Sequence, residues 1–169
     1  MTKQIKRIVL AGGCFWGVER YFQLLKGVVT TTVGYVNGNF KNPKYEDLIN
    51  HRATHAEACE IYYDENIITL QQILEHMFRF IDPTSVNKQG GDVGIQYRTG
   101  VYYKTVEDKK IVENFINQKQ KQYHKSIAVE VVEEKGYYLA EEYHQNYLEK
   151  NPTGYCHVNL NLIKKEELK

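Results

Sequence analysis

The chain reads Ala11-Gly12-Gly13-Cys14-Phe15-Trp16-Gly17 between an apolar run and a helical repeat. The apolar run, residues 8–10, is typical of a buried strand. The residues that follow predict a helix, because apolar side chains recur on one face at Phe15, Val18, Phe22 and Leu25. We therefore expect Cys14 at a strand-to-helix junction, where the two preceding glycines allow a tight turn.

A cysteine at such a junction has two interpretations. It can be a structural thiol in a glycine-rich turn, because cysteine is among the most buried residue types. It can also be a nucleophile, because a helix N-terminus presents free N–H groups and positive partial charge that favour the thiolate. Phe15 and Trp16 favour the second interpretation, since two consecutive bulky aromatics cannot both face the core of one helical turn. We expect at least one of them to line a pocket beside the sulfur.

Length and composition limit the class of protein. With 169 residues, 42% of them hydrophobic and 25% charged, the chain is expected to form a single globular domain, residues 1–169. A net charge of +1 without a long basic run gives no reason to expect nucleic acid as a partner. Three cysteines do not make a disulfide framework and fit a reducing, cytoplasmic location. The apolar run before Cys14 is too short for a lipoprotein signal, and no stretch is long enough to cross a bilayer.

Strand and helix patterns alternate along the chain. The predicted strands are residues 5–10, 29–35, 56–63, 100–103 and 127–132, and the predicted helices are 15–25, 70–81, one beginning after Thr105, and 139–148. Polar connections are expected at 41–55 and 85–98. The order β-α-β-β-α-β-α-β predicts an α/β (α+β) two-layer sandwich with a split βαβ core and a mixed sheet. A tail opens at about residue 151, and we expect it to be flexible.

Several polar residues are not needed by such a fold. Glu57 follows His55 and Ala56 at the start of a predicted strand, and Tyr45 lies in a polar connection. Either could be an ordinary surface side chain. The glycine-containing loop 89–98 supplies Asp92 and Tyr97, and loops on a rigid scaffold often carry function. None of these residues supports a function on its own.

Their order along the chain is more specific. The motifs are Gly-Cys-Phe-Trp-Gly-x-Glu from residue 13, Asn-Pro-x-Tyr-Glu from 42, His-Ala-Glu from 55, Asp-Pro-Thr from 82, Gln-Gly-x-Asp-x-Gly-x-Gln-Tyr-Arg from 89, and Tyr-His-Gln-x-Tyr-Leu from 143. Together they resemble the peptide methionine sulfoxide reductases of the A type, the MsrA family, over residues 7–157. The chain departs from the family pattern at residues 51–54, at Gly91 and at Ile81, which concerns loop shape rather than the chemistry.

The resemblance implies a ferredoxin-like core and repair of oxidative damage by reduction of methionine S-sulfoxide, free or in proteins. It implies that Cys14 attacks the sulfoxide sulfur while Glu57, with a pKa raised by burial, protonates the oxygen. The remaining roles that it implies are oxygen binding by Tyr45 and Tyr97, S-methyl binding by Phe15 and Trp16, and a supporting hydrogen bond from Asp92. No metal or organic cofactor is implied.

The reaction leaves Cys14 as a sulfenic acid, which a second thiol must convert into a disulfide that thioredoxin can reduce. Cys59 lies inside a predicted strand, and a strand cannot travel to meet Cys14. Cys156 lies in the tail, where Pro152 ends a helix and Gly154 gives the backbone freedom. Family members with a Gly-Tyr-Cys-His tail resolve the sulfenic acid with that cysteine, so we expect Cys156 in this role.

Three other functions compete with this one. A metal site is disfavoured because Cys14, His55, Cys59 and His157 lack paired close spacing. A papain-like acyl transferase needs a histidine partner, and no local signature of that kind accompanies Cys14. A redox sensor would show oxidation of Cys14 by peroxide without turnover of sulfoxide. We expect the chain to be a monomer with no nucleic acid or membrane partner.

Overall fold

The centre of the fold is the antiparallel pairing of β1 (Ile5–Gly12) with β3 (Ala56–Asp64) in a computed structural model that describes residues 2–169. Each strand continues into a helix, α1 (Phe15–Gln23) after β1 and α3 (Leu70–Phe80) after β3. Strands β2 (Val28–Val36) and β6 (Thr99–Tyr103) flank the central pair, which gives the order β6-β1-β3-β2. This is a split βαβ arrangement of the ferredoxin type, so the predicted core is confirmed.

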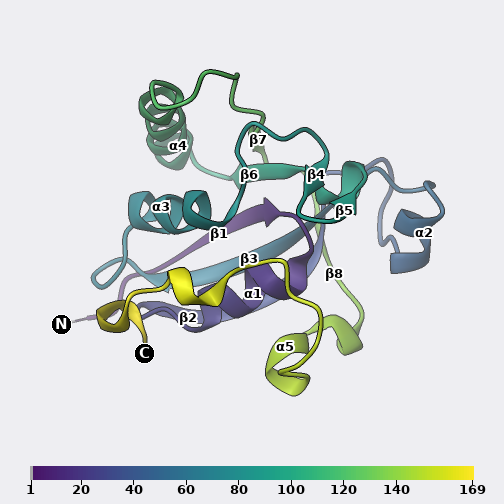
Figure 1. The fold of residues 1–169 in the computed structure, drawn as a ribbon, viewed down its shortest axis with the longest axis horizontal. Helices are drawn as coiled ribbons and strands as arrows, with labels where there is room; N and C mark the ends of the chain where they lie inside the picture. Colours follow the sequence, from purple (N-terminus) through teal and green to yellow (C-terminus); the bar gives the residue numbers. More distant parts are fainter. Residues whose placement is uncertain (1) are drawn as a thin grey trace.

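Two short strands extend the sheet at its edges. The full order is β7-β6-β1-β3-β2-β8, where β7 is Glu130–Glu133 and β8 is Tyr137–Leu139. Strand β7 pairs in parallel with β6, whereas the other neighbouring strands pair antiparallel, so the sheet is mixed as predicted. Helix α4 (Val106–Gln120) makes the connection between β6 and β7 and packs beside α3 (Figure 1).

One face of the sheet carries the main core. Alternate side chains of a strand face the same side, so Ile8, Leu10, Cys59 and Ile61 point together. Helices α1, α3 and α4 cover these side chains. The buried apolar residues that the helices contribute include Val18, Phe22, Leu70, Ile73, Met77, Val112 and Phe115. Because α1 is held in this layer, its first turn is fixed above the ends of β1 and β3.

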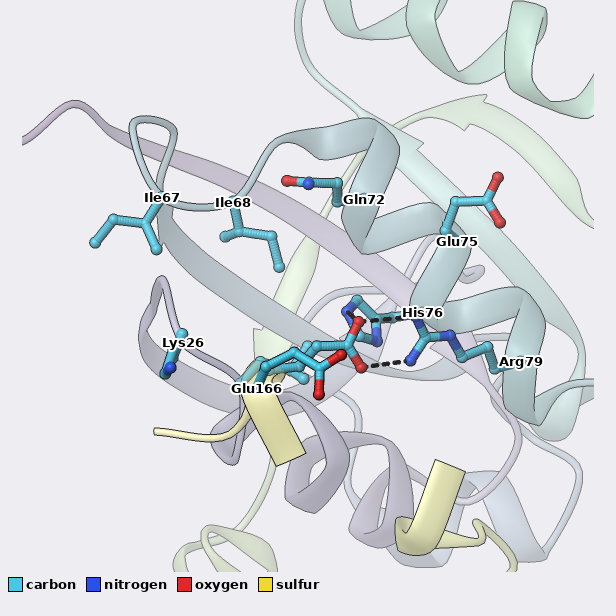
Figure 2. Close-up of a pocket in the computed structure, with 10 residues that line it drawn as sticks. Lys26, Ile67, Ile68, Gln72, Glu75, His76, Arg79 and Glu166 are labelled. Carbon is cyan, nitrogen blue, oxygen red and sulfur yellow. Dashed lines mark hydrogen bonds and ion pairs between the residues drawn. The ribbon is translucent and has the colours of Figure 1, made fainter. Parts of the chain in front are cut away.

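The C-terminal segment returns to this helical layer. Val158 and Ile163 are buried in the main core, and Leu168 forms an antiparallel bridge with Leu25. The two guanidinium nitrogens of Arg79 contact the two carboxylate oxygens of Glu167 at 2.7 and 2.8 Å. Figure 2 shows the hollow beside this ion pair, with Arg79 on α3 at one side, Lys26 at the other and Glu166 between them. Mobility of the stretch from residue 151 onward stays a prediction, although its far end is tied down.

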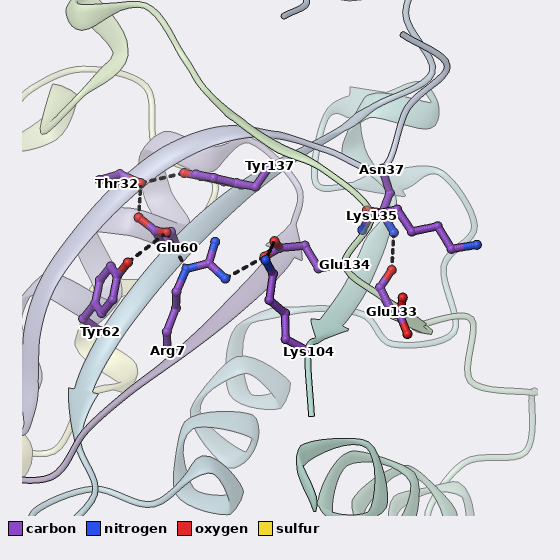
Figure 3. Close-up of polar contacts among 10 residues, drawn as sticks. All are labelled: Arg7, Thr32, Asn37, Glu60, Tyr62, Lys104, Glu133, Glu134, Lys135 and Tyr137. Carbon is purple, nitrogen blue, oxygen red and sulfur yellow. Dashed lines mark hydrogen bonds and ion pairs between the residues drawn. The ribbon is translucent and has the colours of Figure 1, made fainter. Parts of the chain in front are cut away.

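The other face of the sheet carries a polar network (Figure 3). Arg7 on β1 forms ion pairs with Glu60 on β3 and with Glu134, whose carboxylate also contacts Lys104 at 3.2 Å. Tyr137 lies over the same face, and its hydroxyl is 2.6 Å from that of Thr32. These contacts hold residues 133–140 on this face of the sheet, where the segment runs towards the end at which α1 begins.

The predicted helix at residues 139–148 is wrong. This stretch contains the end of β8, a short 3₁₀ turn at Glu142–His144 and the start of α5 (Tyr147–Lys150). Gln145 is the physical reason, because its side chain binds backbone groups outside any helix. Its amide oxygen accepts the Val33 N–H at 2.9 Å, and its amide nitrogen donates to Val33 O at 2.8 Å and Ala140 O at 3.0 Å. The segment is thus held on the edge of β2.

The two predicted polar connections contain small elements of their own. Residues 41–55 include the helix α2 (Tyr45–Ile49), and residues 85–98 include the hairpin of β4 (Lys88–Gln89) and β5 (Asp92–Val93). Both elements place polar side chains at the end of the sheet where α1 begins, as the next section describes. Within residues 2–169 no helix has the length and apolar character needed to span a membrane.

Replacement of Gln145 by leucine tests the tertiary contact that overrides the helical pattern. We expect Gln145→Leu to lower the free energy of unfolding by about 3 kcal/mol, because the buried Val33 N–H loses its partner. Urea denaturation of the variant measures this loss. Gln122→Leu, at an exposed position, is the matched control and should change stability by less than about 0.5 kcal/mol. Equal stability of the two variants would contradict the proposed role of Gln145.

Candidate active site

Cys14 lies where β1 turns into α1, as the sequence predicted. It is the N-cap residue of α1 and is only 8% exposed. Gly13 has a φ of +91°, a conformation that residues with a side chain rarely adopt. A Cβ atom on Gly13 would also lie 2.8 Å from the Gln89 side chain and from the His157 ring. The junction therefore requires glycine for both its backbone angle and its packing.

Glu57 faces this junction from β3. Its side chain is 2% exposed, and its Oε1 accepts the backbone N–H of Phe15 at 3.2 Å. Burial raises the pKa of Glu57 to about 8, helped by the charge of Asp92, while the Phe15 N–H acts in the opposite direction. The carboxyl group is thus mainly protonated at neutral pH, in agreement with the raised pKa expected from the sequence.

The acid–base state of Cys14 differs from the sequence-based expectation. A helix N-terminus was expected to favour the thiolate, but burial raises the pKa of Cys14 well above its usual range. Ionisation of Glu57 would add to this increase, and the Trp16 N–H only partly offsets it. The expectation of an easily ionised thiol is therefore wrong, because loss of solvation outweighs the helix terminus. Cys14 rests as a neutral thiol.

A cavity of about 130 Å³ opens beside these two groups. Every site residue predicted from the sequence except Cys156 lines it, although these residues come from distant parts of the chain. The lining residues are Cys14, Phe15, Trp16, Tyr45, Glu57, Asp92, Tyr97, His144 and Tyr155. The fold thus collects the first turn of α1, the start of α2, the start of β3 and the loop around β5 at one end of the sheet. His144 and Tyr155 were missed.

The aromatic wall of the cavity is rigid. Trp16 stacks on Tyr147 with ring centroids 3.7 Å apart, and its indole N–H donates to His144 Nδ1 at 3.0 Å. Phe15 is 1% exposed and packs against Tyr35 and the His144 ring. Phe15 therefore belongs to the local core and also presents an edge to the cavity, whereas Trp16 is half-buried.

His144 contributes a hydrogen-bond donor that the sequence did not reveal. Since its Nδ1 accepts the Trp16 N–H, its Nε2 must carry the ring proton in the neutral form. Burial lowers the pKa of His144, which favours this neutral form. Nε2 is buried and has no hydrogen-bond partner. The motif Tyr-His-Gln that contains His144 was noted, but the wrongly predicted helix left its direction undetermined.

Tyrosine hydroxyls complete the polar side of the cavity. Burial raises the pKa of both Tyr45 and Tyr97, so both remain protonated and able to donate. The backbone N–H of Tyr45 donates to Glu141 at 2.9 Å, which fixes the start of α2. Tyr155 donates to Asp92 at 2.8 Å and both line the cavity, so the residue next to Cys156 is part of the site.

The two other cysteines differ in position. Cys59 is fully buried in the main core, and Leu10 is its register partner. Cys156 is half-buried, and its sulfur would lie 3.1 Å from a Cβ atom placed on Gly17, in the first turn of α1. All three cysteines are free thiols. Within residues 2–169 no group of three or more His, Cys, Asp or Glu side chains is arranged to hold a metal ion.

Known proteins match this chain over nearly its whole length. A family model described as peptide methionine sulfoxide reductase matches residues 6–169. A relative from Ureaplasma urealyticum serovar 10, named peptide methionine sulfoxide reductase MsrA, is 52% identical over 161 residues, covering 95% of this chain and 98% of the relative.

Solved structures agree with the sequence relatives. Mxr1 from Saccharomyces cerevisiae in reduced form superimposes with a TM-score of 0.87 and 36% identity, covering 92% of each chain. Mxr1 in complex with Trx2 matches with a TM-score of 0.60 and 27% identity, covering 87% of this chain and 89% of that chain. On the strength of the matching family model, the near full-length relatives and the shared fold, this chain belongs to the peptide methionine sulfoxide reductase family.

Proposed function

We propose that this protein reduces the S epimer of methionine sulfoxide, free or in proteins, with Cys14 as the nucleophile and Glu57 as the acid. The observation that carries the proposal is the position of a protonated, buried carboxyl group and a thiol in one cavity with an aromatic wall. A sulfoxide oxygen leaves readily only when it is protonated, so the reaction needs both groups at the same sulfur. Residues 1–169 act as a single catalytic domain in this proposal.

The first step transfers oxygen from the substrate to the enzyme. Cys14 Sγ attacks the sulfoxide sulfur, and Glu57 gives its proton to the sulfoxide oxygen. The Cys14 thiol proton replaces the proton that Glu57 has lost, directly or through water. The hydroxyl then moves from the substrate sulfur to Cys14 Sγ while the bond between the two sulfur atoms breaks, so that methionine leaves and Cys14 carries the oxygen as a sulfenic acid. The sulfoxide is reduced by two electrons and Cys14 is oxidised by two.

Neutral donors stabilise the charge that grows on the oxygen. Tyr45 and Tyr97 line the cavity with their hydroxyls in protonated form, and His144 lines it as a neutral ring. They act without losing a proton, because each retains its hydrogen in the resting protein. Asp92, held by Tyr155, supports the raised pKa of Glu57 through its negative charge.

The aromatic wall binds the methyl group of the substrate. Phe15 and Trp16 offer apolar surface and a favourable contact between ring and sulfur. The stacking of Trp16 on Tyr147 fixes this wall before substrate arrives. The aromatic wall holds the methyl group of the substrate on one side of the cavity, and the hydrogen-bond donors hold the sulfoxide oxygen on the other. This arrangement distinguishes the two sulfoxide epimers.

The second step uses Cys156, which condenses with the sulfenic acid to form a disulfide with Cys14. Support comes from its free, half-buried thiol beside the first turn of α1. A thioredoxin-like protein then reduces the disulfide, and the solved complex of the similar Mxr1 with Trx2 supports this partner. A cytoplasmic monomer is the form we propose, since one chain supplies every residue of the cavity and all three cysteines are free.

Glu57→Gln tests the acid. Glutamine preserves the shape and a donor but cannot give a proton to the leaving oxygen. We expect the rate of methionine formation in a single turnover to fall at least about a hundredfold, with little change in substrate binding. Rapid quenching followed by quantification of methionine measures the rate. An unchanged single-turnover rate would remove Glu57 from this role.

The wild-type rate should also depend on pH in a defined direction. Glu57 acts while it is protonated, and its pKa is about 8, so the single-turnover rate should fall as pH rises above that value. Glu57→Gln should lack this fall. A wild-type rate that instead rises steadily through pH 9 would indicate that ionisation of Cys14 dominates.

Trp16→Ala tests the methyl-binding wall. We expect KM for methionine sulfoxide to rise about fivefold, because a sulfur–ring contact contributes about 1 kcal/mol, and the preference for one epimer to weaken. Alkylation of Cys14 should remain possible. Trp16→Phe, which keeps an aromatic face, is the control and should retain more of the preference. A large loss of thermal stability without a kinetic effect would make Trp16 an ordinary packing residue.

Cys156→Ser tests the resolving thiol. The variant should release one methionine per enzyme but lose turnover supported by thioredoxin, since no second thiol closes the disulfide. Cys59→Ala is the matched control and should turn over like the wild type. After oxidation with one equivalent of sulfoxide, mass spectrometry should find a Cys14–Cys156 bridge in the wild type. Sustained thioredoxin turnover by Cys156→Ser would exclude the assignment.

A further inference from the structure

His157 follows the resolving cysteine and contacts the junction that carries the nucleophile. Its ring nitrogen Nε2 lies 2.8 Å from the carbonyl oxygen of Gly12, the last residue of β1. A carbonyl oxygen only accepts hydrogen bonds, so Nε2 carries the ring proton and Nδ1 bears a free lone pair. Nδ1 is buried and has no hydrogen-bond partner. A buried basic nitrogen without a partner calls for an explanation.

Nδ1 of His157 and the sulfur of Cys156 both lie near Gly17. A Cβ atom on Gly17 would lie 3.1 Å from Cys156 Sγ and 3.3 Å from His157 Nδ1. The sulfur and the nitrogen therefore both lie over Gly17 in the first turn of α1. Gly17 lies three residues after Cys14, and residues with this spacing share a face of a helix. The absence of a side chain at Gly17 leaves room for both atoms beside the nucleophile.

The resolving step needs a base in this position. Burial raises the pKa of Cys156, so its thiol remains protonated at neutral pH. At rest the thiol donates to Val158 O at 3.2 Å, and a carbonyl oxygen cannot remove the proton. Burial lowers the pKa of His157, which keeps its ring neutral and able to accept one. The titratable groups around the ring are Cys156 itself, Cys14 on the junction and Asp92 on β5, since Gln89 and the glycines carry no charge.

We propose that His157 Nδ1 removes the proton from Cys156 as its sulfur attacks the Cys14 sulfenic acid; this rests on the proposed function. The new bond joins the two sulfur atoms, and the bond between Cys14 sulfur and oxygen breaks. The departing hydroxyl takes the proton from Nδ1 and leaves as water. The sulfenic acid is the oxidant and Cys156 is the reductant, so no further reagent is needed. His157 returns to its neutral form, still anchored to Gly12.

His157→Gln removes the basic nitrogen Nδ1 but keeps a hydrogen-bond donor for Gly12 O. The glutamine amide nitrogen can replace Nε2 as the donor to Gly12 O, but no atom with a basic lone pair replaces Nδ1. With one equivalent of methionine sulfoxide, the variant should release methionine at the wild-type rate. Disulfide formation should be about a hundredfold slower at pH 7, as expected for loss of a general base. Quenched-flow mixing, thiol alkylation and mass spectrometry measure the two rates separately.

The pH profile distinguishes a base from a packing residue. In His157→Gln the rate of disulfide formation should rise with pH as the Cys156 thiolate forms, and the defect should shrink. The wild-type rate should be nearly constant above neutral pH. In His157→Ala, which loses both functions, added imidazole should restore part of the rate. His124→Gln, at an exposed position, is the matched control and should match the wild type in both steps.

The possible results distinguish failure of the inference about His157 from failure of the proposed function. Disulfide formation at the wild-type rate in His157→Gln would overturn the inference and leave His157 as an anchor alone. A slow rate that neither higher pH nor imidazole corrects would also overturn it. Failure of the wild-type protein to release methionine would instead contradict the proposed function, and the methionine release of each variant reports that its cavity has folded.

Discussion

The hydrogen bond from the Phe15 N–H to Glu57 Oε1 joins the first turn of α1 to β3 inside a buried site, and the active end of the molecule is built around it. Two effects oppose each other there. The helix terminus favours the charged carboxylate, whereas burial favours the neutral acid. A pKa of about 8 shows that burial dominates. The folded chain thus retains a proton that the unfolded chain releases above its ordinary pKa of 4.5. Between these values stability falls as pH rises, so the acid is maintained at a thermodynamic cost.

Glycines at the junction of β1 and α1 leave room for the C-terminal segment to pack against the site. Gly13 and Gly17 face the ring of His157, and Gly17 also faces Cys156. Tyr155 lines the cavity and donates to Asp92. The same segment is anchored beyond these residues by Val158 and by the pairing of Leu168 with Leu25. The disulfide that we propose between Cys156 and Cys14 therefore has to form while the segment stays anchored at Val158 and Leu168.

The sequence predicted the architecture because periodicity reports which faces are buried. The strand patterns of β1 and β3 and the helical pattern predicted at residues 70–81 are local signals that the tertiary structure leaves intact. The helical pattern at residues 139–148 was overridden by Gln145, whose partners lie on β2, far away in the sequence. No local pattern encodes such a contact.

The same limit applies to the candidate site. The resemblance to the MsrA family placed Cys14 and Glu57 in one site, whereas the position of Glu57 at the start of a predicted strand did not. Tyr155 was missed because its contact with Asp92 joins the tail to a loop of irregular shape. The pKa of Cys14 was wrongly expected to be low, because the helix terminus is visible in a sequence and the degree of burial is not.

The raised pKa of Cys14, which the sequence did not predict, affects whether the thiol reacts with oxidants or with sulfoxides. A neutral, buried thiol reacts slowly with oxidants, because the thiolate is the reactive form. The nucleophile of a repair enzyme is exposed to the same oxidants that damage its substrates. In the proposed reaction the thiol becomes reactive when a sulfoxide enters the cavity and its oxygen accepts the proton of Glu57, which allows Glu57 to receive the proton of Cys14. The substrate itself thus completes the path by which the thiol is activated. Under the proposed function, the raised pKa values of Cys14 and Glu57 therefore keep the thiol unreactive at rest and direct its reactivity to sulfoxides.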